Sequence, residues 1–216
     1  MGSLSDDTAA AAKAESGHFS PFPQMPTSHP SHSREKTMSQ AIDDLRHDHE
    51  AILSAWDILD RIEAAGRQGT ASSGDITSFI SFLKEFVDKC HHGKEEGMLF
   101  PDLAQAGASE QESSVPALLS EHEEGRALIR TMEEASHPVL QPEPFSAAAK
   151  AYSHHLRAHI EKENGILFPA AEQALGEGEL ESLRRAFDRH EDEVIGHGRH
   201  EELHRMLHEL RAKYLH

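Results

Sequence analysis

Cysteine, basic side chains and long apolar runs are all scarce in this sequence, and each scarcity excludes a class of protein. The 216 residues include a single cysteine, Cys90, which excludes an intramolecular disulfide framework and fits a reducing compartment. Lys and Arg number 21 against 38 Asp and Glu, so the net charge is −17. Because nucleic-acid backbones and anionic membranes attract clustered Lys and Arg, we expect neither as a partner.

The chain also has no apolar run long enough to span a bilayer, and its N-terminus lacks the basic-then-apolar order of a signal peptide. We therefore expect a cytoplasmic protein. Residues 1–37 are rich in Ala, Ser, Pro and His and lack apolar periodicity. Such a segment cannot bury enough surface to offset its ordering entropy, so we predict a disordered N-terminal tail. The rest, 38–216, is predicted to form one folded domain.

The period-two alternation of a half-buried strand is missing, whereas apolar residues recur at the three- and four-residue steps of a helix. On one face of the first predicted helix, His49 lies between Leu45 and Ile52, so this histidine is predicted to point into the core. Three comparable segments follow, and two shorter helices come after the GEGE sequence at 176–179. We predict an all-α fold, an antiparallel four-helix bundle with additional C-terminal helices.

Histidine, in contrast, is abundant, with 18 residues. Neutral imidazole is the commonest protein ligand for transition metals. In the last predicted helix, HEELH at 200–204 matches the zinc motif of metalloproteases, whose third ligand usually lies well downstream. Only a dozen residues follow His204, and the compact variant of the motif would need a histidine where the chain has Leu210. We therefore predict that this helix closes over the bundle and is not a catalytic zinc site.

An internal repeat is the stronger signal. HHGKEEGMLFP at 91–101 and HIEKENGILFP at 159–169 share His, Lys, Glu, Gly, Leu, Phe and Pro at equivalent positions. An acidic residue, His and Glu precede each segment, at 48–50 and at 121–123. Each half is therefore predicted to be a helical hairpin that offers one histidine from its first helix and an H-x-x-x-E pair from its second.

The spacing within these pairs has a physical meaning. Residues four apart lie on one face of a helix, so His91 with Glu95, and His159 with Glu163, each present a nitrogen beside a carboxylate. Two buried carboxylates in one core repel each other unless cations lie between them, and two bridged metal ions would satisfy both pairs. Nitrogen and oxygen ligands without thiolates suit iron, manganese or zinc, and a carboxylate-bridged pair with some imidazole suits non-haem iron best.

A ferritin-like di-iron bundle is a competing interpretation, because it also places its site in a four-helix bundle. That fold requires Glu-x-x-His on two helices and further glutamates on the others. The chain has this pattern only at Glu201-x-x-His204, so the histidine-rich site is favoured.

The order His, His-x-x-x-Glu, His, His-x-x-x-Glu, flanked by KEE-x-x-LFP and EH-x-x-GR, resembles the hemerythrin-like family of HHE cation-binding domains. The resemblance extends over roughly residues 41–210 and implies that 38–216 is a hemerythrin-like bundle domain with two non-haem iron ions. Manganese or zinc are possible in their place. In the implied assignment one metal binds the first two histidines, the other metal binds the last two, and both glutamates bridge: His49, His91, His122, His159, Glu95 and Glu163.

One position departs from the family pattern. Oxygen-carrying hemerythrins have a histidine four residues after that of the third helix, where this chain has Arg126. The missing ligand could come from His155, from His200 or His204 in the last helix, or from water, and Arg126 could balance the charge of the carboxylates. His92 lies about 100° around an α-helix from its neighbour, so it is not expected to reach the same site.

An iron pair with an incomplete ligand shell has an open position for O2, peroxide or nitric oxide in a core that excludes bulk water. We therefore expect a protein that binds or senses such a small oxidant. The alternatives are a di-iron oxidase or peroxide-consuming enzyme, and a protein that handles iron or nitric oxide under stress. No sequence feature indicates an organic substrate.

Overall fold

The computed structural model describes residues 39–109 and 114–215, and within these residues the chain is helical with no strand. The α-helices (α) and π-helical segments (η) are α1 (Gln40–Arg67), α2 (Ser73–Phe82), η1 (Leu83–His92), η2 (Glu95–Leu99), α3 (Phe100–Gln105), α5 (Val115–Ser136), α6 (Pro142–Lys162), η3 (Glu163–Leu167), α7 (Phe168–Ala174), α8 (Glu177–His190), η4 (Glu191–Gly196) and α9 (Arg199–Tyr214). The predicted all-α fold is confirmed. The predicted tail at 1–37 lies outside the described residues, so the tail and the domain boundary stay predictions.

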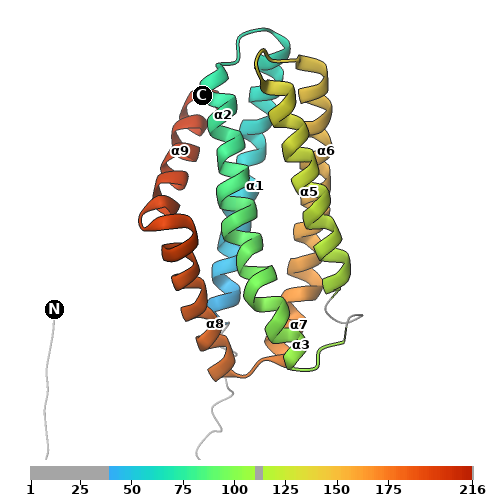
Figure 1. Ribbon diagram of the computed structural model, residues 1–216, viewed down its shortest axis with the longest axis vertical. Coiled ribbons are helices and arrows are strands. Elements are labelled where there is room, and N and C mark those ends of the chain that lie inside the picture. Colours follow the sequence, from blue (N-terminus) through green and yellow to red (C-terminus); the bar gives the residue numbers. More distant parts are fainter. Residues whose placement is uncertain (1–38, 110–113, 216) are drawn as a thin grey trace, which may run out of the picture. The chain divides into compact units, whose positions relative to one another are not determined.

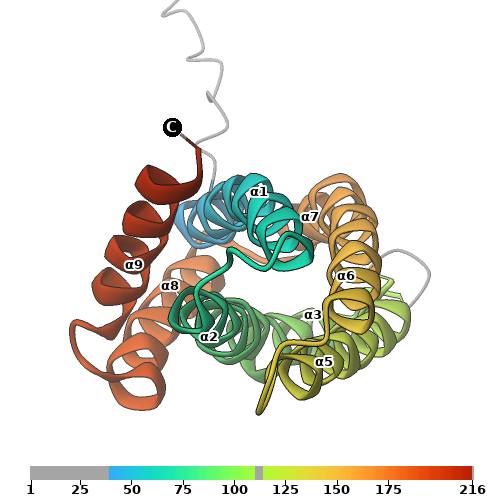
Figure 2. The same ribbon diagram turned by 90° about the horizontal axis from the view of Figure 1, so that it is seen from above.

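Four long helical segments form the bundle: α1, the run from α2 to α3, α5, and the run from α6 to α7 (Figure 1). Seen along its axis, α1, α2, α5 and α6 surround a common core (Figure 2). Helix α6 packs most extensively against α5 and α1. Helices α8 and α9 lie outside this ring against α1. None of the described helices is long and apolar enough to cross a membrane.

Helix α9 is fastened to the bundle at both ends. Near its start, the Arg199 guanidinium donates to Glu85 from Nε (2.8 Å) and Nη2 (2.9 Å). Near its end, Lys213 Nζ and the Tyr214 hydroxyl donate to Asp75 Oδ2 at 2.5 and 2.6 Å. These contacts join α9 to α2 and η1, so the last helix covers one side of the bundle as predicted.

The two halves share an unusual local geometry just before the LFP sequences. The π-helical segments η2 and η3 begin at Glu95 and Glu163, and each ends two residues before a proline, Pro101 or Pro169. In an α-helix the proline ring would clash with the carbonyl four residues earlier. A π-helical turn is wider and relieves that clash, and such turns are frequent at functional sites. The repeated proline therefore explains why both halves widen at equivalent positions.

Two apolar clusters fill the core, with a polar layer between them. The larger includes Trp56, Phe86, Ile129 and Tyr152, and the smaller includes Leu45, Leu118, Phe100 and Phe168. Along α1 the order is Leu45, His49, Ile52, and along α5 it is Leu118, His122, Ile129, so each histidine lies between the clusters. Each fully buried apolar side chain of this size contributes about 1.5–3 kcal/mol. The apolar layers therefore stabilise the bundle and keep water away from the histidines.

Candidate metal centre

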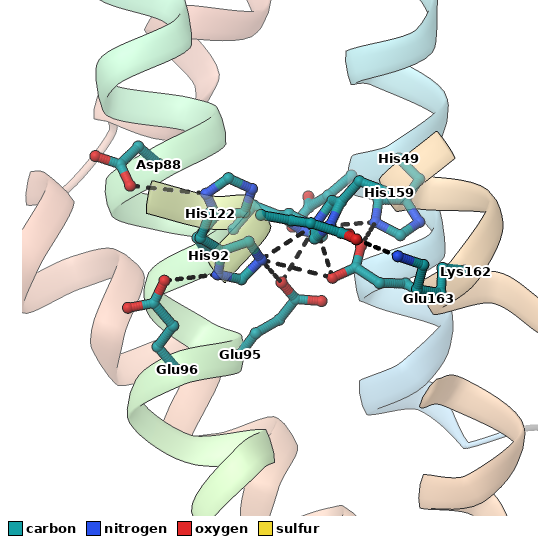
Figure 3. A network of polar contacts seen from close by, with 12 residues as sticks. His49, Asp88, His92, Glu95, Glu96, His122, His159, Lys162 and Glu163 are labelled. Carbon is teal, nitrogen blue, oxygen red and sulfur yellow. Dashed lines mark hydrogen bonds and ion pairs between the residues drawn. The ribbon is translucent and has the colours of Figure 1, made fainter. Parts of the chain in front are cut away.

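Six side chains from the four bundle segments meet in the polar layer, and Figure 3 shows most of them pointing toward a common centre. Each is at most 2% exposed. They come from α1, from the junction of η1 and η2, from α5, and from the junction of α6 and η3: His49, His91, Glu95, His122, His159 and Glu163. The structure thus brings together all six residues that the sequence predicts as ligands.

The first group consists of His49, His91, Glu95 and Glu163, whose ligand-type atoms lie within 4.8 Å of one another. The Nε2 atoms of the two histidines are 2.9 Å apart. Glu163 Oε2 lies 3.1 Å from His49 Nε2, and Glu95 Oε2 lies 3.8 Å from His91 Nε2. Two nitrogens and two carboxylates around one point form a donor set for a transition metal.

The second group consists of His122 and His159 with the same two glutamates, again within 4.8 Å. The two Nε2 atoms are 3.1 Å apart. Glu163 Oε1 lies 2.9 Å from His159 Nε2, and Glu95 Oε2 lies 3.5 Å from His122 Nε2. Because both carboxylates belong to both groups, the arrangement can bridge two adjacent cations.

Both glutamates are fully buried, and their carboxylate oxygens make no hydrogen bond within the described part of the chain. Burial and the negative charge of Glu163 raise the pKa of Glu95 well above its usual range. Burial acts in the same direction on Glu163, but the imidazoles around it, His159 foremost, outweigh burial and lower its pKa. Two such carboxylates at close range require positive charge beside them.

In His91 and His159, the ring nitrogen that points away from the centre is Nδ1. In each residue this nitrogen faces an acidic residue of the same half of the repeat. His91 Nδ1 lies 3.4 Å from Asp48 Oδ2, and His159 Nδ1 lies 3.0 Å from Glu121 Oε2. An acid at this position keeps the proton on Nδ1 and leaves the Nε2 lone pair free for a metal. These acids directly precede His49 and His122 in the repeat, but sequence reasoning did not assign them as partners of His91 and His159.

In His49 and His122, the nitrogen that points away from the centre is again Nδ1, but it faces a residue from the other half of the repeat. His49 Nδ1 donates to Asn164 Oδ1 at 3.2 Å, and His122 Nδ1 donates to Glu96 Oε1 at 2.6 Å. Asn164 and Glu96 occupy equivalent positions, each directly after a buried glutamate. Sequence reasoning missed both of these partners, although their equivalence in the repeat could have revealed them. All four histidines therefore direct Nε2 inward.

Metal ions fit this arrangement. Two Nε2 atoms face each other at 2.9 Å in one group and at 3.1 Å in the other, and a cation beside each pair could bind both nitrogens. The carboxylate oxygens without hydrogen bonds need such a partner. Imidazole and carboxylate donors without thiolate suit iron, manganese and zinc.

The repeat also places a lysine beside each acid. Lys94 is buried and donates to Asp48 Oδ2 at 3.1 Å and to Glu191. Lys162 donates to Glu121, but its side chain is 32% exposed. The hydrogen bonds of the first pair are therefore shielded from water, whereas those of the second compete with it.

Arg126 lies beside the second group and binds three carboxylates. Its Nε donates to Asp88 Oδ1 at 2.7 Å, Nη2 to Glu96 Oε1 at 2.6 Å, and Nη1 to Glu123 Oε1 at 2.8 Å. Since Glu96 is the partner of His122, the arginine holds that acid in position.

The other candidate ligands do not join the six. His155 Nε2 donates to the backbone oxygen of Glu121 at 2.7 Å. His200 stacks on the Phe86 ring with a centroid distance of 5.2 Å, and His204 meets the same ring edge-on at 5.0 Å. Among the described residues, neither of the two groups of ligand-type atoms includes His155, His200 or His204.

Helix α9 presents the HEELH residues in an arrangement unlike a zinc site. Glu201, which would be the general base, is exposed. The buried residues of α9 are Leu203, Leu207 and Leu210, and they belong to the larger apolar cluster. The helix thus packs on the bundle through leucines, as the sequence-based interpretation expects.

As expected, His92 does not belong to the group of ligand-type atoms that contains His91. It nevertheless lies in the polar layer, beside the second group. It is 3% exposed, and its ligand-type atom lies within 4.8 Å of those of His122 and His159. The reason is that η1 is π-helical through His92, and a π-helix turns less per residue than the assumed α-helix. Burial, together with the neighbouring His122, lowers the pKa of His92 well below 6.5, so the ring is neutral at pH 7.

Comparison with known families agrees with this geometry. The family described as the hemerythrin HHE cation-binding domain matches residues 40–171. The chain belongs to this family. The matched region contains all six inward-facing residues and ends within α7, so α8 and α9 lie outside it.

Curated relatives include proteins called iron-sulfur cluster repair protein YtfE. The protein from Escherichia coli O81 is 30% identical over 103 residues, which is 44% of this chain and 46% of the relative. That from Escherichia fergusonii is 29% identical over 103 residues, with the same coverage. The chain therefore spans about half the length of the curated relatives it matches. No solved structure matches the chain.

Proposed function

We propose that the protein binds two non-haem iron ions in the bundle core and there binds or senses a small oxidant, O2, peroxide or nitric oxide. The observation behind the proposal is the pair of histidine groups whose Nε2 atoms face each other and share Glu95 and Glu163. His49 and His91 would hold one ion, and the second pair of histidines the other. Bound iron would supply a redox-active Lewis acid with exchangeable positions.

The chain's own residues set what can reach such ions. The six inward-facing side chains are buried between two apolar clusters, so bulk water and large substrates are excluded. The outward hydrogen bonds of the histidines fix the orientation of each ring before any metal arrives. A buried site between apolar layers suits a small molecule.

Metal analysis after anaerobic reconstitution with Fe(II) tests the first part of the proposal. We expect two iron ions per chain in the parent protein, and about one in His49→Ala and in His122→Ala, because each change disables one group. His154→Ala removes an exposed histidine of α6 and should retain two ions. Two ions in all four proteins would refute the assignment.

Exposure of the reduced iron-loaded protein to O2, peroxide or nitric oxide tests the second part. An optical change that reverses when the gas is removed indicates binding or sensing. Continuous oxidant consumption without a stable spectral change indicates the alternative, a di-iron oxidase or peroxide-consuming enzyme. No response to any of the three would contradict both interpretations.

The resemblance to proteins called iron-sulfur cluster repair proteins favours a second candidate, the handling of iron under oxidative or nitric-oxide stress. In that function the bound iron would be delivered instead of retained. We would incubate the iron-loaded protein with a cluster protein damaged by nitric oxide and follow the cluster absorbance. Recovery that requires the iron-loaded form supports delivery, and iron that stays bound excludes it.

A further inference from the structure

We propose that His92 is a third imidazole ligand of the metal ion held by His122 and His159. This inference rests on the proposed metal binding and adds a residue that the six-ligand pattern does not contain. It would also supply a ligand in place of the histidine that oxygen-carrying hemerythrins have at the position of Arg126.

The burial of His92 is the first argument. The ring is 3% exposed, and neither of its nitrogens has a hydrogen-bond partner among the described residues. Asp88 Oδ1 is 3.7 Å from Nδ1, which is beyond hydrogen-bonding distance, and its strong partner is Arg126 at 2.7 Å. An imidazole buried without partners is costly, and a ligand bond to a metal would satisfy it.

The position of the ring is the second argument. His92 stacks on His122 with centroids 3.8 Å apart and planes at 13°, and it meets His159 edge-on at 5.6 Å. The three ligand atoms lie within 4.8 Å of one another. Metal–nitrogen bonds of about 2.1 Å allow two ligand nitrogens to be up to roughly 4.2 Å apart. The same 4.8 Å limit encloses the ligand atoms of the other two groups, so His92 is placed as closely to His122 and His159 as the members of those groups are to one another.

The repeat supplies the third argument. The residue equivalent to His92 in the second half is Ile160, which is buried in the larger apolar cluster. The repeat thus offers an extra imidazole only toward the second group, the one that lost a family ligand at Arg126. The partner of His122 is also a carboxylate, Glu96, where the equivalent partner in the other group is an amide. The two metal positions should therefore differ, with the stronger donors at the second.

The test uses Co(II) alone as the probe, added anaerobically to the metal-free full chain. In the parent protein loaded with two Co(II) ions, each ligand histidine should give one paramagnetically shifted, exchangeable ring N–H signal in the proton NMR spectrum. We expect five such signals, from His49, His91, His92, His122 and His159. Four signals would overturn the inference without any substitution being made.

Substitution provides the second readout. His92→Phe keeps an aromatic ring for stacking on His122, and His92→Ile introduces the residue of the other half. Both substitutions should raise the dissociation constant of one of the two Co(II) ions by about 10- to 100-fold and leave that of the other unchanged. His154→Gln, which removes an exposed histidine, should change neither. In the His49→Ala variant, which should still bind one Co(II) ion, adding His92→Phe should weaken the binding of that ion.

The outcomes separate the two proposals. If the parent chain does not bind two Co(II) ions, the proposed metal function fails, and the role of His92 fails with it. If the parent binds two ions but His92→Phe and His92→Ile bind both as tightly as the parent, only the role of His92 is refuted.

Discussion

Replacing Glu95 with leucine should change the stability of the protein in opposite directions with and without metal. Glu95 is fully buried, its oxygens make no hydrogen bond, and its neighbour Glu163 is a second buried carboxylate. In the metal-free protein Glu95→Leu removes a buried polar group without partners. In the metal-loaded protein the same change removes a ligand shared by both groups.

The magnitudes follow from these two roles. A buried polar group without a hydrogen-bond partner costs about 1–3 kcal/mol, which is the expected gain on its removal without metal. A domain of this size shifts its Tm by about 2–4 °C per kcal/mol, so the metal-free variant should melt roughly 2–12 °C higher. Each metal at 100 times its Kd contributes about 2.7 kcal/mol, hence about 5.4 kcal/mol for two. Losing both exceeds the gain, so the sign reverses.

The metal-free comparison should also depend on pH. Burial raises the pKa of Glu95 in the folded state, so its contribution to stability is fully present below the unfolded pKa. That contribution is lost as the pH rises through the raised folded pKa. The leucine variant has no carboxyl group at this position, so its stability does not fall in this way. The difference in stability between the variant and the metal-free parent should therefore grow with pH.

Thermal unfolding followed by circular dichroism, with excess Fe(II) under anaerobic conditions and again after chelation, measures both signs. Glu161→Leu is the control, because it makes the same chemical change at an exposed position between His159 and Glu163 in the sequence. The reasoning is wrong if the metal-free Glu95→Leu protein melts below the metal-free parent, or if chelation leaves the Tm of the parent unchanged.

Three further predictions test parts of the fold around the site. Lys94→Met should cost about 3–5 kcal/mol in urea unfolding because it removes the lysine that pairs with the buried acid Asp48. Lys162→Met, its equivalent in the repeat, should cost at most about 1 kcal/mol because its side chain is 32% exposed; equal costs would contradict this. The parent should cleave no peptide, and Glu201→Gln should retain full metal content; cleavage abolished by that change alone would favour the zinc interpretation. Burial raises the pKa of Asp75, but the hydrogen bond from Lys213 outweighs burial and lowers it. The contribution of Asp75 to stability should therefore be lost as the pH falls below 3.8, and hydrogen-exchange protection at the end of α9 should fall in the same range. Asp75→Asn should not show this pH dependence.

The helical architecture and the six inward-facing residues could be predicted because both depend on local, repeated patterns. The spacing of Leu45, His49 and Ile52 places the histidine among core residues whatever the neighbouring helices do. The four-residue step from His91 to Glu95 likewise places both side chains toward one face of the second segment. Two copies of one pattern in a single chain made chance an inadequate explanation.

The role of His92 could not be predicted, because it depends on the path of the backbone and on a neighbouring helix. The sequence-based expectation assumed an α-helical turn, whereas η1 is π-helical up to His92. Which group the ring joins was decided by the packing of η1 against α5, which brings it onto His122.

The partners of the outward nitrogens divide in the same way. Asp48 and Glu121 stand beside His49 and His122 in both copies of the repeat, so the sequence could have drawn attention to them, although it did not show which ring each acid faces. Asn164 and Glu96 reach their histidines only across the bundle, over separations of 115 and 26 residues. A helical periodicity states which face of a segment is buried, but not which residue of another segment that face meets. That pairing was determined by tertiary packing, because only the assembled bundle brings an outward Nδ1 to its acceptor.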